Sequence, residues 1–190
     1  AEGFAAVGAR VVVASHKADA CDEAVAAIRR AGGTALAVPT HMGDLDAVAG
    51  LVRSAVEEFG GIDVVVNNAA NPLALPIGSI TPAALATSHD VNLRGPLFLV
   101  QAALPHLRAS DHAAIVNVLT AGIFTHGRFV SLYVAATSAL AAFTRAMAAE
   151  LAGDGIRANG LAPGTVRTDM VLNTPEEFPA LAVDAQLIKR

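Results

Sequence analysis

Residues 61 to 68 read GIDVVVNN, and this stretch decides the fold. Its three consecutive valines, with no polar residue between them, indicate a strand buried on both faces, which is typical of a parallel sheet covered by helices. Asn67 and Asn68 end the apolar run, so polar side chains follow the strand at its carboxyl end. In open α/β sheets, ligands bind beyond the carboxyl ends of the strands. The stretch therefore predicts both an architecture and the edge at which a site should lie.

The same apolar pattern recurs on both sides of this stretch, and segments of helical period separate the repeats. The predicted strands are 9–15, 34–40, 61–68, 113–120 and 156–162. Such alternation predicts the α/β class, with a doubly wound, mostly parallel sheet and helices on both faces. We expect one domain over residues 1–190, because no repeat, linker or low-complexity tract divides the chain.

Helix boundaries are marked by capping residues. Asp44 precedes an apolar stripe at helical spacing over 48–59 and is predicted to cap that helix. Thr81 followed by Pro82 predicts a second helix start, and the glycines at 32–33 predict a helix end. A further helix is predicted from Ser131 up to the Gly-Asp-Gly break at 153–155.

The composition excludes several classes of function. With 54% hydrophobic and 16% charged residues, the 190-residue chain is expected to form a compact core. Its net charge of -4 and the lack of a Lys- and Arg-rich run argue against nucleic acid as a partner. Because there is no signal-peptide pattern and no run of about 18 apolar residues, we expect no membrane segment and a cytoplasmic location.

The cysteine and the histidines give no sign of a redox or metal site. Cys21 is the only cysteine, which fits a reducing compartment. The histidines lack metal-ligand spacing, so we expect no metal site. They are His16, His41, His89, His106, His112 and His126.

Tyr133 and Thr137 stand four residues apart on the predicted helix, so they share one face and can act on the same bound molecule. A tyrosine that works as an acid or base usually needs a nearby cation to bring its pKa of about 10 toward neutrality. Thr137 carries no charge.

Several motifs, in order along nearly the whole chain, resemble those of the short-chain dehydrogenase/reductase family, whose fold is a Rossmann-like NAD(P)-binding sheet. NNAA at 67–70 resembles the family's Asn-Asn-Ala-Gly. VNLRGP at 91–96 places Asn92 at the family's active-site asparagine, and YVAAT at 133–137 falls on its Tyr-x-x-x-Lys.

The resemblance implies an oxidoreductase that moves hydride between a nicotinamide cofactor and a carbonyl or secondary alcohol. It implies that Tyr133 is the proton donor or acceptor and that Thr120 replaces the usual serine. Asn92 would hold a water chain, and Thr137 occupies the place of the lysine. The resemblance also implies that residues 67–70, from Asn67 to Ala70, line the cofactor groove. The implied cofactor contacts are Ser15, His16, Lys17, His41, Met42, Asn68, Ala69, Ala70, Tyr133, Pro163, Gly164, Val166 and Thr168.

The last residue of the first predicted strand bears on the choice of cofactor. An acidic residue there would bind the ribose 2′-hydroxyl of NAD(H), but Ser15 occupies the position and His16 and Lys17 follow it. This set suits a 2′-phosphate, so NADP(H) is favoured over NAD(H). His41 replaces an aspartate that the family often places near the adenine.

Three departures from the family pattern are evident. The chain opens on the last turns of a helix ending at Gly8, without the family's first strand and Gly-rich turn, and it stops at LIKR before the family's last strand. We therefore expect a partial domain with a gap in its sheet, truncated at both ends.

The third departure is Thr137. Without a cation, the pKa of Tyr133 is expected near 10, so about one molecule in a thousand carries tyrosinate at neutral pH. Carbonyl reduction, which needs the protonated phenol, should then be favoured over oxidation, and Thr137→Lys should raise turnover. The alternative is an impaired or inactive relative that acts as a dimer partner or regulator.

Each of these residues also has a structural reading. Tyr133 can be a core residue with a bonded hydroxyl, and Asn92 a local cap. Thr120 can be a plain strand residue and Thr137 a helix-face residue, while 163–164 can be a simple turn. In the family, the helices that carry Phe98 and Phe143 pack against their copies, so an exposed apolar face there would imply a homodimer or homotetramer.

Overall fold

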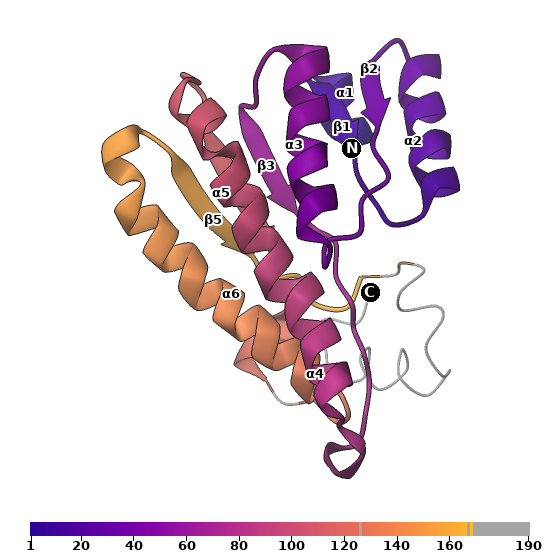
Figure 1. Cartoon of the computed structure of the whole chain (residues 1–190), viewed down its shortest axis with the longest axis vertical. Helices are drawn as coiled ribbons and strands as arrows, with labels where there is room; N and C mark the ends of the chain where they lie inside the picture. The colour runs from indigo at the N-terminus through magenta and orange to yellow at the C-terminus, as the bar shows by residue number, and fades with distance from the viewer. Residues whose placement is uncertain (126, 167, 169–190) are drawn as a thin grey trace.

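The computed structural model describes residues 1–125, 127–166 and 168 (Figure 1). His126, Arg167 and the segment 169–190, which includes LIKR, lie outside the described residues.

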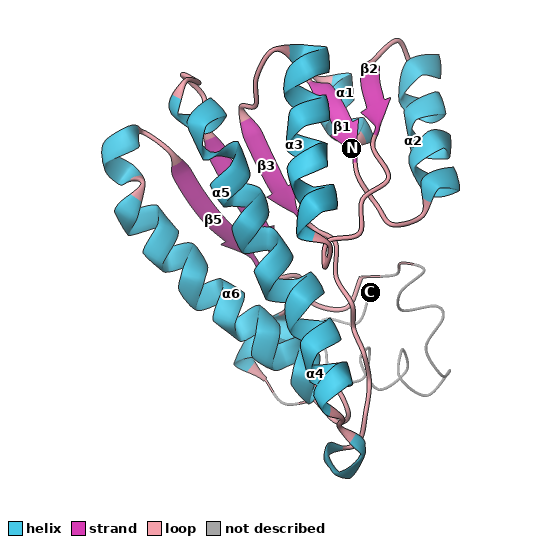
Figure 2. Ribbon diagram, in the orientation of Figure 1, coloured by secondary structure: helices cyan, strands magenta, loops and turns pink. Residues whose placement is uncertain are grey.

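Parallel strands alternate with helices along the described chain (Figure 2). The strands are β1 (Arg10–Val13), β2 (Thr34–Ala37), β3 (Val64–Asn67), β4 (Ala114–Val118) and β5 (Arg157–Leu161). The α-helices are α1 (Glu2–Ala6), α2 (Ala18–Arg30), α3 (Leu45–Phe59), α4 (Pro82–His89), α5 (Gly95–Arg108) and α6 (Ser131–Glu150). Short helical turns are η1 (Ile77–Ser79), η2 (Asp90–Arg94), η3 (Ala121–Phe124) and η4 (Ala152–Asp154). Each predicted strand is confirmed, and each is shorter than its apolar segment.

The strands form two parallel sheets. β1 pairs with β2, so that Val11 lies opposite Ala35, and β4 lies between β3 and β5, so that Asn67 lies opposite Asn117. Within the described residues no hydrogen-bonded ladder joins β1 to β3. The predicted α/β class is therefore confirmed, and the expected gap in the sheet separates the β1–β2 pair from β3.

Each sheet has its own core. Val25 and Ile28 of α2 pack on Ala35 of β2. The larger core joins α3, α5 and α6 to the three-stranded sheet, with Ile115 of β4 fully buried at its centre. Figure 1 shows these three helices crossing in front of the strands. On the other side of β3, Val64 remains 42% exposed, so that side of the strand is open.

The predicted helix caps are confirmed. The Asp44 side chain accepts hydrogen bonds from the backbone N–H groups of Asp46 and Ala47 at the start of α3. The Thr81 hydroxyl accepts one from the N–H of Ala84 at the start of α4. Because these caps hold the first turns of α3 and α4, they also fix the loops that precede them at the carboxyl edge of the sheets.

Helix α6 is long and apolar enough, by length and composition alone, to cross a membrane. It packs along β4 and β5, and it buries Ala136, Leu140 and Met147. A core helix of an α/β domain also meets these criteria of length and composition, and α6 packs on the strands as such a helix does.

Candidate active site

Backbone hydrogen bonds draw together the loops that follow the strands. The N–H of Leu119 donates to the oxygen of Leu161 at 2.7 Å, and the N–H of Ala121 donates to that of Pro163 at 2.8 Å. These bonds set the segment after β4 beside the segment after β5. The turns η2 and η3 both contact α6, so Asn92, Thr120 and Tyr133 lie on neighbouring elements at one edge of the fold.

Tyr133 lies in the first turn of α6, as predicted, and its side chain is half-buried. Burial raises the pKa of the Tyr133 phenol above its ordinary value of about 10, because taking tyrosinate out of water is unfavourable. The expectation of a pKa near 10 did not include this desolvation, which moves the pKa upward. Among the described residues no cation lowers the pKa in compensation.

Thr137 is turned into its own helix. Its side chain is 3% exposed, and its hydroxyl donates toward the backbone oxygens of Tyr133, at 2.8 Å, and Val134, at 3.2 Å. A threonine inside a helix commonly bonds to the preceding turn in this way. The interpretation of Thr137 as an ordinary helix residue without a catalytic role therefore accounts for its contacts. Because the hydroxyl hydrogen is directed to the backbone, it cannot be donated to a ligand.

Thr120 follows β4 with extended backbone and caps η3. Its Oγ1 accepts a hydrogen bond from the N–H of Gly122 at 3.1 Å. Since this bond uses only a lone pair, the hydroxyl hydrogen can still be donated to a bound molecule.

Asn92 is 2% exposed and holds the loop after β3. Its Oδ1 accepts from the N–H of Asn71 at 2.7 Å, and its Nδ2 donates to the oxygen of Asn71 at 2.9 Å and to Oγ of Ser88 at 3.2 Å. Both hydrogens of Nδ2 are therefore used within the protein, and the side chain acts as a clamp. No local pattern pointed to Asn71, because only the fold brings it to Asn92, whereas Ser88 stands four residues before Asn92 and could have been found from that helical spacing.

Asn92 lies in the π-helical turn η2, where α4 passes into α5. Pro96, one residue into α5, has no N–H to bond the carbonyl four residues earlier, which favours a wider turn at this point. Single π-helical turns are frequent at functional sites.

Asn67 is buried in the sheet, so the expectation that it lines a groove is wrong. Its Nδ2 donates to Oδ1 of Asn117 at 2.8 Å, and Nδ2 of Asn117 donates to Oγ1 of Thr144 at 2.8 Å. This polar chain ties β3 and β4 to α6. The predicted contacts Asn68 and Ala69 are exposed just beyond it, and Ala70 is half-buried.

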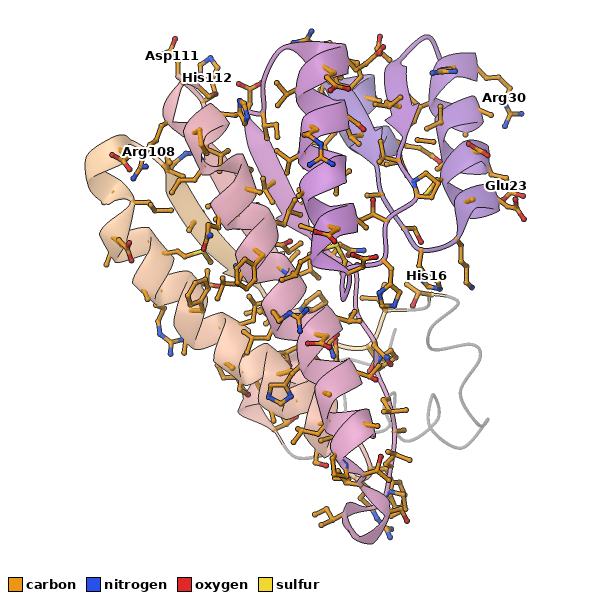
Figure 3. The ribbon with its side chains drawn as sticks, in the orientation of Figure 1. His16, Glu23, Arg30, Arg108, Asp111 and His112 are labelled. Atoms are coloured by element: carbon orange, nitrogen blue, oxygen red, sulfur yellow. The ribbon has the colours of Figure 1, made fainter. Side chains whose placement is uncertain are left out.

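A second group of predicted residues lies at the carboxyl ends of β1 and β2. Ser15 is half-buried, and its Oγ accepts from the N–H of Lys17 at 3.3 Å. His16 and His41 are exposed, with ring centroids 6.3 Å apart and planes inclined at 72°. Figure 3 labels His16 beside the first turn of α2, at the opposite end of that helix from Arg30.

Met42, also predicted to contact a cofactor, is buried with Val48 and Val91. It packs against the start of α5, where a Cβ on Gly95 would lie 2.1 Å from the Met42 oxygen. Only glycine fits there, so Gly95 sets how closely α5 approaches the loop after β2. Sequence reasoning missed Gly95, because the contact joins residues far apart in the chain.

The remaining predicted contacts follow β5. Pro163 accepts the bond from Ala121 described above, while Gly164, Val166 and Thr168 are exposed, Val166 to 54%. The structure thus places Pro163 at the same edge as Thr120, and the side chains of Val166 and Thr168 are exposed.

Known proteins share both the sequence pattern and the fold. The chain is 35% identical over 167 residues to galactitol 2-dehydrogenase of Agrobacterium fabrum, covering 87% of this chain and 64% of that protein. It spans 58% to 65% of the length of this and three further curated relatives.

Two solved structures superpose closely. The blue fluorescent protein from a metagenomic library in complex with NADPH has a TM-score of 0.86 at 30% identity, over 95% of this chain and 74% of that one. The 7α-hydroxysteroid dehydrogenase complexed with NADH and 7-oxo glycochenodeoxycholic acid has a TM-score of 0.94 at 26% identity, over 100% of this chain and 74% of that one.

The family model described as short chain dehydrogenase matches residues 1–178. With the fold and the order of the motifs around Asn92 and Tyr133, this match shows that the chain belongs to the short-chain dehydrogenase/reductase family.

Proposed function

We propose that this protein is an NAD(P)-dependent oxidoreductase that reduces a small-molecule carbonyl, prefers NADP(H) and uses Tyr133 as the proton donor. The observation that carries this proposal is the half-buried phenol of Tyr133, whose pKa burial raises, at the edge where Thr120 and Asn92 also lie. A phenol in this state keeps its proton at neutral pH and can give it to a carbonyl oxygen.

The residues at the ends of β1 and β2 fit the adenosine end of such a cofactor. His16 and Lys17 are exposed donors, and Ser15 takes the position where an acidic side chain would repel a 2′-phosphate. When bound, the nicotinamide supplies or accepts the hydride. Solved relatives were obtained with NADPH and with NADH, which supports the cofactor class.

The nicotinamide end has a weaker set of donors. The Thr137 hydroxyl donates to the backbone of α6, so it supplies neither a charge nor a hydrogen-bond donor to a ribose. Thr120 keeps a hydroxyl hydrogen that can orient the substrate oxygen toward Tyr133. The chain's own residues therefore support proton donation better than proton abstraction.

The same observation on Thr137 favours a second candidate, a catalytically impaired relative that acts as a dimer partner or regulator. Phe98 on α5 is 36% exposed and Leu85 on α4 is 43% exposed, so apolar surface remains on these helices. A homodimer or homotetramer in the cytoplasm is consistent with both candidates.

Cofactor titration followed by turnover separates the two candidates. NADPH fluorescence is titrated with the protein, and NADPH consumption is then followed with a panel of aldehydes and ketones. The proposal predicts consumption that Tyr133→Phe abolishes while NADPH still binds. Binding without consumption, in the wild type and in Thr137→Lys alike, would support the impaired relative.

A further inference from the structure

A buried row of polar residues crosses the three-stranded sheet and continues into α6. Asn67 of β3 lies opposite Asn117 of β4, which lies opposite Gly160 of β5. Both asparagine side chains are buried, as is Thr144 of α6, whose Oγ1 accepts a hydrogen bond from Nδ2 of Asn117 at 2.8 Å. The polar row of Asn67, Asn117 and Thr144 has no part in the proposed chemistry, so its place in the core needs another reason.

The hydrogen bonds of the polar row run in one direction. The hydroxyl of Thr144 donates to the backbone oxygen of Leu140 at 2.7 Å, so its oxygen is left to accept from Asn117. Oδ1 of Asn117 in turn accepts from Nδ2 of Asn67 at 2.8 Å. Oδ1 of Asn67 is buried and has no partner among the described residues. A buried acceptor without a partner costs free energy of folding, which apolar side chains of the same shape would avoid.

The apolar contacts beside the polar row set how closely α6 approaches the strands. A Cβ on Gly160 would lie 2.9 Å from Cδ1 of Leu119 and 3.9 Å from Cγ2 of Thr144. Leu119 and Leu140 belong to one buried cluster at this place. Because apolar contacts are not directional, they fix the distance between helix and sheet better than the position of the helix along its axis.

The hydrogen bond between Asn117 and Thr144 does fix that axial position. A slide of α6 by one residue, about 1.5 Å, would stretch the 2.8 Å contact beyond hydrogen-bond length. Tyr133 stands three helical turns before Thr144 on the same face of α6. Thr120 follows Asn117 where the chain leaves β4. The same slide would therefore carry Tyr133 past Thr120.

We infer that Asn117 and Thr144 are positioning residues, whose hydrogen bond sets the register of α6 on β4 and so holds Tyr133 beside Thr120 for proton donation. The inference rests on the proposed function of Tyr133. Neither residue touches the reacting atoms. A displacement of reacting groups by about 1 Å can slow a reaction about a hundredfold, so the register of one helix is enough to matter.

Two substitutions of Thr144 separate its hydroxyl from its bulk. Thr144→Val keeps the shape and loses the hydroxyl, whereas Thr144→Ser keeps the hydroxyl and loses a methyl group. We expect kcat for carbonyl reduction with NADPH to fall about ten- to a hundredfold in Thr144→Val and to stay within about threefold of the wild type in Thr144→Ser. KM for the carbonyl and the affinity for NADPH should stay near the wild-type values in both.

Lost stability is controlled at Ile115, which is buried on β4 two residues before Asn117. Ile115→Val should lower the midpoint of urea unfolding and leave kcat unchanged. If Thr144→Val does not fold, the combined variant Asn67→Leu, Asn117→Leu and Thr144→Val replaces it, because this variant leaves no polar group of the row without a partner. Its kcat should be reduced as in Thr144→Val, and a wild-type kcat would overturn the inference.

The ionisation of Tyr133 tests the same register without turnover. Tyr133 is the only tyrosine and the chain has no tryptophan, so tyrosinate absorbance in an alkaline titration reports this group. In Thr144→Val the raised pKa of Tyr133 should fall toward about 10, because the first turn of α6 gains water, and in Thr144→Ser it should stay at the wild-type value.

Equal pKa values of Tyr133 in Thr144→Val and Thr144→Ser would overturn the inference. Turnover that is the same in these two variants would refute the inference alone. The predicted difference in pKa, in a protein that consumes no NADPH with any carbonyl tested, would refute the proposed function and leave the register intact.

Discussion

The hydroxyl of Thr137 donates to the backbone oxygen of Tyr133, 2.8 Å away on the same helix. Thr137 is thereby bonded inward to its own helix, and it brings no charge to the phenol of Tyr133. Tyr133 carries the cost of burial, and among the residues that the structure describes none supplies the electrostatic compensation of a neighbouring cation. Under the proposed function, this relationship favours proton donation over proton abstraction.

Replacing Thr137 with lysine should restore that compensation. A positive charge within about 4–6 Å lowers the pKa of an acid by about 1–3 units, which makes the phenol a stronger acid and gives more tyrosinate. We expect carbonyl reduction to accelerate about tenfold or more, and alcohol oxidation to gain more than reduction, in steady-state assays of both directions.

Thr137→Met is the matched control for that variant, because methionine adds length at the same buried position without charge. It should leave both rates near the wild-type values. Equal gains from lysine and methionine would show that bulk rather than charge limits turnover.

The two reaction directions should respond differently to pH. Because the pKa of Tyr133 is raised, the phenol stays protonated through the neutral range, and proton donation during reduction should not decline until the pH exceeds about 10. Oxidation, which needs tyrosinate, should rise about tenfold per pH unit over the same range. Initial rates at saturating substrate check this, and a reduction rate that halves between about pH 7 and 8 would contradict it.

The clamp between Asn92 and Asn71 should contribute to stability. Asn92→Ala leaves the N–H and the oxygen of Asn71 without their partner, which should cost about 2 to 4 kcal/mol of unfolding free energy. Ser88→Ala removes only one of the clamp's bonds and should cost about 1 kcal/mol. Urea unfolding measures both, and an equal loss in the two variants would argue against the clamp.

Gly95 should tolerate no side chain. Gly95→Ala puts a Cβ 2.1 Å from the Met42 oxygen, so the start of α5 must move, at a cost of about 1–3 kcal/mol. Gly153→Ala is the control, because its Cβ would meet nothing within 4 Å. The control should change the unfolding free energy by less than about 0.5 kcal/mol.

Much of the fold could be predicted from local pattern. The valines of β3 and the capping groups of Asp44 and Thr81 act within a few residues of themselves, so the sequence alone determines them. The π-helical turn at Asp90–Arg94 was missed, although Pro96, which has no N–H, marks it in the sequence. The close approach of Gly95 to Met42 could not be predicted, because the contact joins distant parts of the chain.

The candidate site was predicted less completely than the fold. The positions of Tyr133, Thr120 and Asn92 followed from their motifs, whereas the contacts of their side chains did not. The inward hydrogen bond of Thr137 could have been predicted, because a threonine inside a helix commonly donates to a backbone oxygen of the preceding turn. The burial of Asn67 and the rise in the pKa of Tyr133 depend on surrounding atoms that only the folded chain supplies.

The ionisation of Tyr133 is the most direct test of the central claim, that this half-buried phenol has no cation beside it within the described residues. Tyr133 is the only tyrosine and the chain has no tryptophan, so the near-ultraviolet absorbance of tyrosinate reports this one group. Titrated with alkali in the folded protein, Tyr133 should show a pKa above the ordinary value of about 10 and should ionise at lower pH in Thr137→Lys. A pKa well below 10 in the wild type would reveal a cation beside the phenol and contradict the account.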